Sequence, residues 1–88
     1  MIELNLPVPI QNQADVPQYI SLNANSYETL RQTLKADYSK LYNVIFHENG
    51  QQHGFLQFVY QDRLLKENDK QKIPDGAQIE IITALSGG

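Results

Sequence analysis

The chain has 88 residues, 41% of them apolar, which is enough for one small domain with a single core. It contains no cysteine, so disulfides, thiol catalysis and cysteine-ligated metal centres are excluded. The net charge of −3 gives no electrostatic footprint for nucleic acid or an anionic membrane. No apolar run approaches the ~18 residues of a membrane span, and the first residues do not form a signal peptide, so we expect a soluble, cytoplasmic, acidic domain.

The first part of the chain predicts a β-hairpin. Apolar residues alternate with others over residues 2–10, which is typical of a half-buried strand. Pro7 and Pro9 cannot donate to a β-ladder, so the second half of this strand lies at a sheet edge or has left the sheet. The polar residues 11–17 predict the hairpin loop, and renewed alternation over residues 19–24 predicts the second strand.

The hydrophobic period then changes to that of an amphipathic helix of about three turns. Asn25 is the predicted N-cap, with Glu28 three residues later at the capping-box spacing. We expect the helix to end near residues 38–40. The apolar positions recur at offsets of three and four: Tyr27, Leu30, Leu34, Tyr38 and Leu41.

The second half predicts further short strands. Residues 44–46 form a buried strand or a turn packed on the core, and residues 47–54 form a polar loop. Residues 55–60 predict a strand, followed by a turn at Asp62 and Arg63 that leads to Leu64 and Leu65. A charged surface stretch over residues 66–72, a turn at Asp75 and Gly76, and a last strand over residues 79–83 complete the domain.

This element order predicts an α+β β-grasp domain over residues 1–84, in which a mixed sheet of four to five strands packs on one main helix. Residues 85–88 are expected to form a flexible tail. The usual catalytic patterns are missing, because the sequence holds no glycine-rich phosphate loop and no nucleophile elbow. His47 and His53 would need Glu48 as a third metal ligand, so we predict two solvated loop histidines, no bound metal and no bound cofactor.

The informative feature is the ending, Gly87 and Gly88, directly after a strand. Two residues without side chains can thread a narrow slot beside a nucleotide, which leaves the Gly88 carboxylate as the reactive group. A carboxylate becomes an acyl donor once ATP converts it to an acyl-adenylate. The alternative is that the two glycines are a frayed or artificial end.

The last fifteen residues, 74–88, resemble the ending of the MoaD/ThiS sulfur-carrier family, whose members are ubiquitin-like β-grasp proteins. Residues 27–34 resemble the start of the family's helix, and residues 55–62 resemble its central strand and turn, so the resemblance covers nearly the whole chain. The sequence departs from the family pattern at Ala77, where an acidic residue is usual, and at Asp62, where a turn glycine is usual.

The resemblance implies a carrier and not an enzyme. A MoeB/ThiF-like adenylating enzyme would use ATP to activate Gly88, with Gly87 giving access and Leu85 and Ser86 guiding the tail. In the sulfur-carrier branch the carboxylate becomes a thiocarboxylate, which delivers sulfur to a synthase subunit that makes molybdopterin, thiazole or cysteine-type products. The first alternative is a protein modifier joined through Gly88 to target lysines. The second alternative is a β-grasp interaction module whose tail takes part in no chemistry.

One further pattern predicts a docking surface. If Phe58, Tyr60, Ile79 and Ile81 face the helix, the opposite phase leaves an exposed apolar patch that leads to the tail, made of Phe55, Val59 and Ile82. The alternative is a bulge that turns Ile82 inward. The resemblance favours the patch, because relatives dock their activating enzymes through this sheet face.

Overall fold

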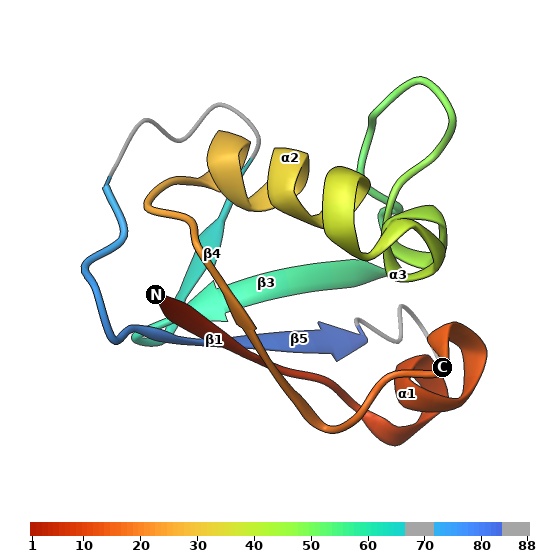
Figure 1. The fold of residues 1–88 in the computed structure, drawn as a ribbon, viewed down its shortest axis with the longest axis horizontal. Coiled ribbons are helices and arrows are strands. Elements are labelled where there is room, and N and C mark those ends of the chain that lie inside the picture. The colour runs from red at the N-terminus through yellow and green to blue at the C-terminus, as the bar shows by residue number, and fades with distance from the viewer. Residues whose placement is uncertain (67–71, 84–88) are drawn as a thin grey trace.

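The computed structural model describes residues 1–66 and 72–83. Within them the elements follow the order of a β-grasp fold, with two additional short helices (Figure 1). The elements are β1 (Ile2–Asn5), α1 (Val8–Ala14), β2 (Tyr19–Leu22), α2 (Tyr27–Asp37), α3 (Ser39–Ile45), β3 (Leu56–Tyr60), β4 (Arg63–Leu65) and β5 (Gln78–Thr83).

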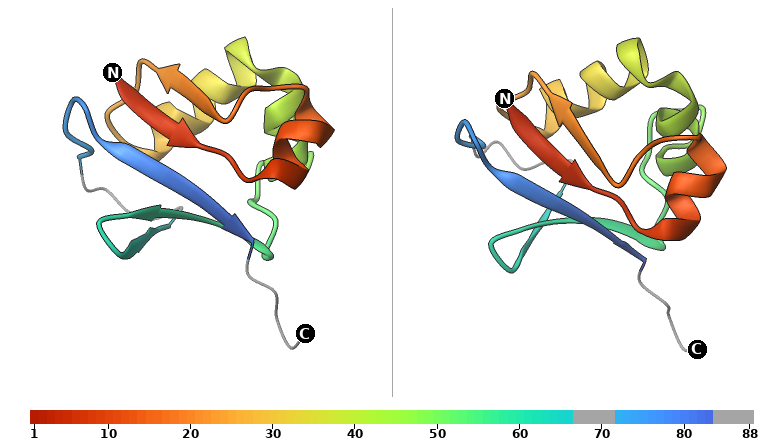
Figure 2. Two further views of the ribbon diagram at one scale, coloured as in Figure 1. Left: turned by 90° about the horizontal axis from the view of Figure 1, so that it is seen from below. Right: turned by 60° about the horizontal axis from the view of Figure 1, so that its bottom comes forward.

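The strands form one mixed sheet in the order β2-β1-β5-β3-β4, which confirms the expected α+β class. The central strand β5 pairs in parallel with β1 and antiparallel with β3, and the remaining pairs are antiparallel. Helix α2 lies across one face of the sheet (Figure 1), and the left panel of Figure 2 looks onto the other face, with α2 and α3 behind the sheet and α1 beside it. We call the face toward α2 the inner face and the opposite one the outer face.

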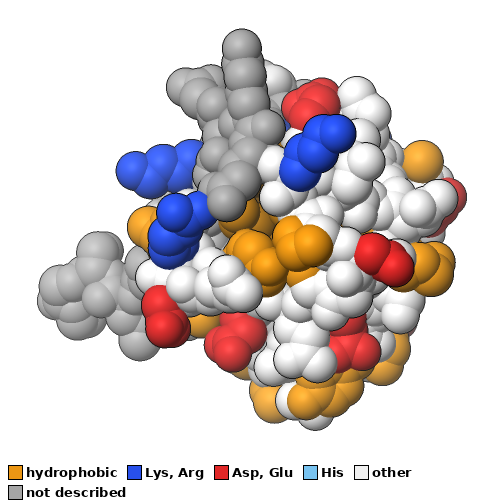
Figure 3. Space-filling model, turned by 90° about the vertical axis from the view of Figure 1, so that its left-hand side faces the viewer, with side chains coloured by type: hydrophobic (Ala, Val, Ile, Leu, Met, Phe, Trp, Pro, Cys, Tyr) orange, Lys and Arg blue, Asp and Glu red, His pale blue; other side chains and the backbone are white. Residues whose placement is uncertain are grey.

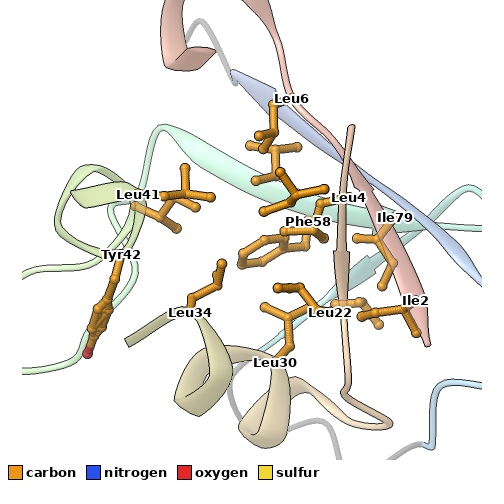
Figure 4. Close-up of a cluster of buried hydrophobic side chains, with 14 of the residues drawn as sticks. Ile2, Leu4, Leu6, Leu22, Leu30, Leu34, Leu41, Tyr42, Phe58 and Ile79 are labelled. Carbon is orange, nitrogen blue, oxygen red and sulfur yellow. The ribbon is translucent and has the colours of Figure 1, made fainter. Parts of the chain in front are cut away.

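The core lies between α2 and the inner face. Leu30 and Leu34 of α2 point into the space where Leu4 and Phe58 of the sheet lie (Figure 4), and all four side chains are buried. Burying a side chain of this size stabilises the fold by about 1.5–3 kcal/mol relative to leaving it in water. Tyr27 adds an edge-to-face contact with Phe58 at 6.0 Å between ring centroids.

The prediction for residues 2–17 is wrong after the first strand. β1 ends at Asn5, and the predicted hairpin loop is largely the helix α1. Pro7 is its N-cap and a second proline lies in its first turn. Backbone N–H groups of the first turn have no acceptor within the helix, so a proline there costs no helical hydrogen bond. Ile10 and Ala14, four residues apart, are the buried positions, so the apparent period of two hides a helical one.

The main helix begins one residue later than predicted. Ser26, and not Asn25, is the N-cap of α2: its Oγ accepts a hydrogen bond from the Thr29 amide at 3.2 Å. Thr29 Oγ1 accepts one in return from the Ser26 amide at 3.0 Å, which completes a capping box. Glu28, the predicted box partner, pairs instead with Arg31 at 2.6 Å.

The apolar stripe of the main helix is divided between two helices. Tyr38 leaves helical geometry at φ −136°, so α2 ends at Asp37 and α3 begins at Ser39. Residues 44 and 45 therefore belong to α3 and not to a strand, while Phe46 forms only an isolated bridge with Gln52. The burial predicted for this segment is still present at Ile45 and Phe46.

The strands predicted over residues 55–60 and 79–83 are confirmed to within one residue, as β3 and β5. The turn predicted at Asp62 and Arg63 begins one residue earlier. The two-residue turn between β3 and β4 is Gln61 and Asp62, both with positive φ, and Arg63 already belongs to β4. The predicted turn at Asp75 and Gly76 is present, with Gly76 in the left-handed region at φ 85°. The charged stretch predicted over 66–72 lies largely outside the described residues.

Candidate functional site

The base of the tail is held by the central strand of the sheet. β5 pairs with a strand on each side, through Asn5↔Glu80 in β1 and Gln57↔Ile82 in β3. Thr83 is the last described residue, five positions before the C-terminal glycine. The tail residues predicted from the sequence lie outside the described residues: Leu85, Ser86, Gly87 and Gly88.

Helix α1 forms one wall of a groove beside the end of β5. The groove has a volume of about 540 Å³, and its lining includes Val8 and Gln11 on one side and Ile82 and Thr83 on the other. The Gln11 side chain donates a hydrogen bond to the Leu6 carbonyl at 2.8 Å, which fixes α1 against the end of β1. The sequence analysis missed this wall because it divided α1 between the end of a strand and a hairpin loop.

The alternation predicted for β5 and β3 is present. Ile79, Ile81 and Phe58 are buried on the inner face, and Tyr60 is partly buried against them. On the outer face Ile82 is 39% exposed, so no bulge turns it inward. Val59 is half-buried and lies diagonally across the β3–β5 pair from Ile82, since its direct partner is Glu80.

Phe55, the third predicted patch residue, is 56% exposed but precedes β3 and belongs to the preceding loop. Its ring lies 5.3 Å from the ring of His53. The structure thus brings Val59 and Ile82 onto one surface and associates Phe55 with the histidine loop. The role of all three in docking remains a prediction.

Leu64 of β4 is a surface residue that the sequence reasoning missed. It is 44% exposed and is the direct partner of Val59, so both side chains lie on the outer face. Its neighbour Leu65 faces inward and is buried. Two adjacent leucines give no signal about which one is exposed until the hairpin register is known. We call Val59, Leu64 and Ile82 the outer patch.

The two loop histidines contact each other. The ring centroids of His47 and His53 are 3.8 Å apart, and the loop that joins them is closed by a hydrogen bond from the His53 amide to the Ile45 carbonyl at 2.8 Å. Partial burial, and then the charge of His47, lower the pKa of His53 below its ordinary value. Within residues 1–66 and 72–83, no three side chains of the metal-binding types come together at a site for an ion.

Several solved structures of small proteins share the fold of this chain. SAMP1 from Haloferax volcanii matches with a TM-score of 0.73 and 12% identity over 99% of this chain and 98% of its own. A chain of the BexX/CysO complex from Amycolatopsis orientalis matches with a TM-score of 0.78 and 12% identity, covering both chains completely. Urm1 from Sulfolobus solfataricus matches with a TM-score of 0.70 and 23% identity over 92% of this chain and 97% of its own.

The chain has the ubiquitin-like β-grasp fold. This confirms, for the fold, the resemblance that the sequence carries in its C-terminal residues. No profile of a known protein family matches the sequence, and no curated protein matches it either. The described helices include none with the length and apolar character that crossing a membrane requires.

Proposed function

We propose that this chain is a ubiquitin-like sulfur carrier that works through its C-terminal carboxylate. A MoeB/ThiF-like enzyme would activate Gly88: a carboxylate oxygen attacks the α-phosphorus of ATP, pyrophosphate leaves, and an acyl-adenylate forms. A sulfide-level donor then attacks the acyl carbon and AMP leaves, which gives a thiocarboxylate. A synthase subunit would accept this sulfur.

The observation that carries the proposal is the short stretch of sequence between the sheet and the diglycine. Five residues separate the end of β5 at Thr83 from the Gly88 carboxylate. A segment of that length reaches at most about 17 Å when extended. A partner that docks on the outer patch, beside Ile82, could therefore hold the carboxylate in a nearby nucleotide site. Gly87 and Gly88 have no side chains that would obstruct a narrow entrance, and Leu85 and Ser86 would guide the tail.

The solved relatives support the proposal without deciding between two kinds of chemistry. CysO is seen in a complex with BexX, which shows that a relative with this fold associates with another protein. SAMP1 from Haloferax volcanii is named a small archaeal modifier protein. This name favours a second candidate function, in which a lysine amine attacks the same acyl intermediate and an amide bond joins Gly88 to a target.

An adenylation assay tests the step that both functions share. The intact chain is incubated with ATP and a MoeB/ThiF-like enzyme of the same organism, and ATP–pyrophosphate exchange is measured. We expect exchange with the intact chain and none with a variant that ends at Ser86. A variant with Lys72→Ala is the matched control, because Lys72 is exposed and distant in sequence from the tail. Equal exchange with and without the glycines, or no exchange with the intact chain, would contradict the proposal.

A further inference from the structure

A hollow of about 400 Å³ opens on the outer face beside the outer patch. The register of the sheet forms its floor: Glu3 lies beside Gln78, and Asn5 lies beside Glu80. Val59 of β3 is the direct partner of Glu80 in β5. It forms one wall of the hollow and also belongs to the outer patch. Asp62, at the β3–β4 turn, and Tyr19 of β2 also line the hollow. The apolar surface and the hollow are therefore continuous.

The described lining of the hollow is acidic and includes no basic side chain. Three of the lining residues that the structure describes carry carboxylates: Glu3, Asp62 and Glu80. Ion pairs between described residues join Met1 to Asp75, Glu28 to Arg31 and Asp15 to Lys40, and none of these pairs includes one of the three carboxylates. Neighbouring carboxylates on one surface repel one another, so a cation that enters the hollow gains from all three.

The basic residues of the chain lie elsewhere in the sequence. All seven occur between residues 31 and 72, so β1, β2 and β5 contain none. Among the coloured residues of Figure 3, the basic side chains lie in the upper half of the view, whereas the lower half shows acidic side chains and none that is basic. The β1–β5 half of the outer face therefore attracts a positively charged partner surface.

We propose that the hollow receives an arginine side chain of the protein that docks on the outer patch. A guanidinium group is planar and has five N–H donors, which suits a site with three carboxylates and the side-chain oxygens of Asn5 and Gln78. Tyr19, which is 51% exposed, offers an aromatic face on which a guanidinium stacks better than a lysine ammonium. This inference rests on the proposed function, because the docking protein is the adenylating enzyme.

Adenylation kinetics test the inference with a charge-matched control. The double variant Glu3→Gln with Glu80→Gln keeps the side-chain shapes and removes two charges from the hollow. Asp37→Asn with Glu48→Gln removes two charges from exposed residues that do not line it. We expect the first variant to raise the KM for the carrier about tenfold, with kcat unchanged, and the second to match the intact chain. The KM of the intact chain should also rise more steeply with salt than that of the first variant.

The outcomes separate the inference from the function on which it rests. An equal KM for the two double variants would overturn the inference, while adenylation of the intact chain would still support the proposed function. Heteronuclear NMR spectra of each variant confirm that the fold is intact.

A direct probe tests the hollow even if no adenylation is seen. The isotope-labelled chain is titrated with N-acetyl-arginine amide, with the neutral isostere N-acetyl-citrulline amide as control. We expect the arginine compound alone to shift the amide resonances of Asn5, Gln78 and Glu80. Equal shifts with citrulline, equal shifts with N-acetyl-lysine amide, or no shifts would overturn the assignment to a guanidinium. Shifts of the same resonances that depend on protein concentration alone would indicate a second copy in the hollow and would also overturn it.

Discussion

The two faces of the sheet differ in what their side chains do for the fold. On the inner face, Ile79, Ile81 and Phe58 are buried against the helices. On the outer face the sheet carries carboxylates and amides around apolar side chains that stay exposed, such as Ile82 of β5 and Leu64 of β4. Burial accounts for the inner residues completely. The outer apolar residues gain little from folding, and the docking proposed above would bury them against another protein.

Adjacent isoleucines of β5 give the sharpest test of this difference. Ile81 is 3% exposed and Ile82 is 39% exposed, so the two alanine substitutions remove the same atoms from opposite faces. Ile81→Ala should lower the free energy of unfolding by about 2–5 kcal/mol, because it leaves a cavity in the core. Ile82→Ala should lower it by less than about 1 kcal/mol and instead raise the KM of adenylation.

Urea unfolding of both variants, followed by the adenylation assay, checks this prediction. A leucine pair on β4, Leu65→Ala and Leu64→Ala, repeats the comparison on another strand with the same inward and outward arrangement. If Ile82→Ala destabilised the fold as much as Ile81→Ala, the claim that the inner face stabilises the fold and the outer face serves docking would be refuted.

The cap of α2 provides a prediction of intermediate size, because this helix covers the inner face. Ser26→Ala removes the side-chain oxygen that accepts from the Thr29 amide and should cost about 1 kcal/mol of stability. Asn25→Ala, at the N-cap expected from the sequence, should cost only a few tenths of a kcal/mol. Thermal unfolding of the two variants decides which residue caps the helix, and a larger loss for Asn25→Ala would contradict the structure.

The histidine loop should show the smallest effect. Because the pKa of His53 is lowered in the folded state, the unfolded chain binds its proton more readily. Stability should therefore fall as the pH drops through the ordinary histidine pKa near 6.5, until the folded-state pKa of His53 is passed. NMR titration should find His53 below that ordinary value. His47→Asn should raise the pKa of His53 part of the way back, because it removes the second cause and leaves the burial.

A His53 pKa that stays the same in His47→Asn would show that the contact between the two rings has no electrostatic effect. His47→Asn should leave adenylation unchanged, since the residue does not line the hollow or belong to the outer patch.

The sequence predicts well wherever a single period decides which side chains are buried. Alternation over residues 79–83 correctly assigns Ile81 to the inner face and Ile82 to the outer face. The same rule fails over residues 8–14, because alternating apolar residues around two prolines mimic a strand while the buried pair, Ile10 and Ala14, has helical spacing. Local patterns cannot separate the two when a helix is only seven residues long.

Other features depend on contacts between segments that are distant in the sequence. The break at Tyr38 lets α3 turn away from α2, although the apolar stripe runs on to Leu41 without interruption. The exposure of Leu64 follows from its register with Val59, which the turn at Gln61 and Asp62 sets. The acidic hollow combines residues of four strands and one turn, so no single stretch of sequence reveals it.

The most direct test of the account is the intact mass of the protein isolated from its native cells, with the C-terminal peptide sequenced. We predict that part of the population carries sulfur in place of one oxygen of the Gly88 carboxylate. Branched peptides that join Gly88 to a lysine of another protein would show the modifier function in place of the carrier function. A chain that always ends in an unmodified carboxylate, and whose function survives removal of Gly87 and Gly88, would contradict the central claim that this carboxylate is the working group.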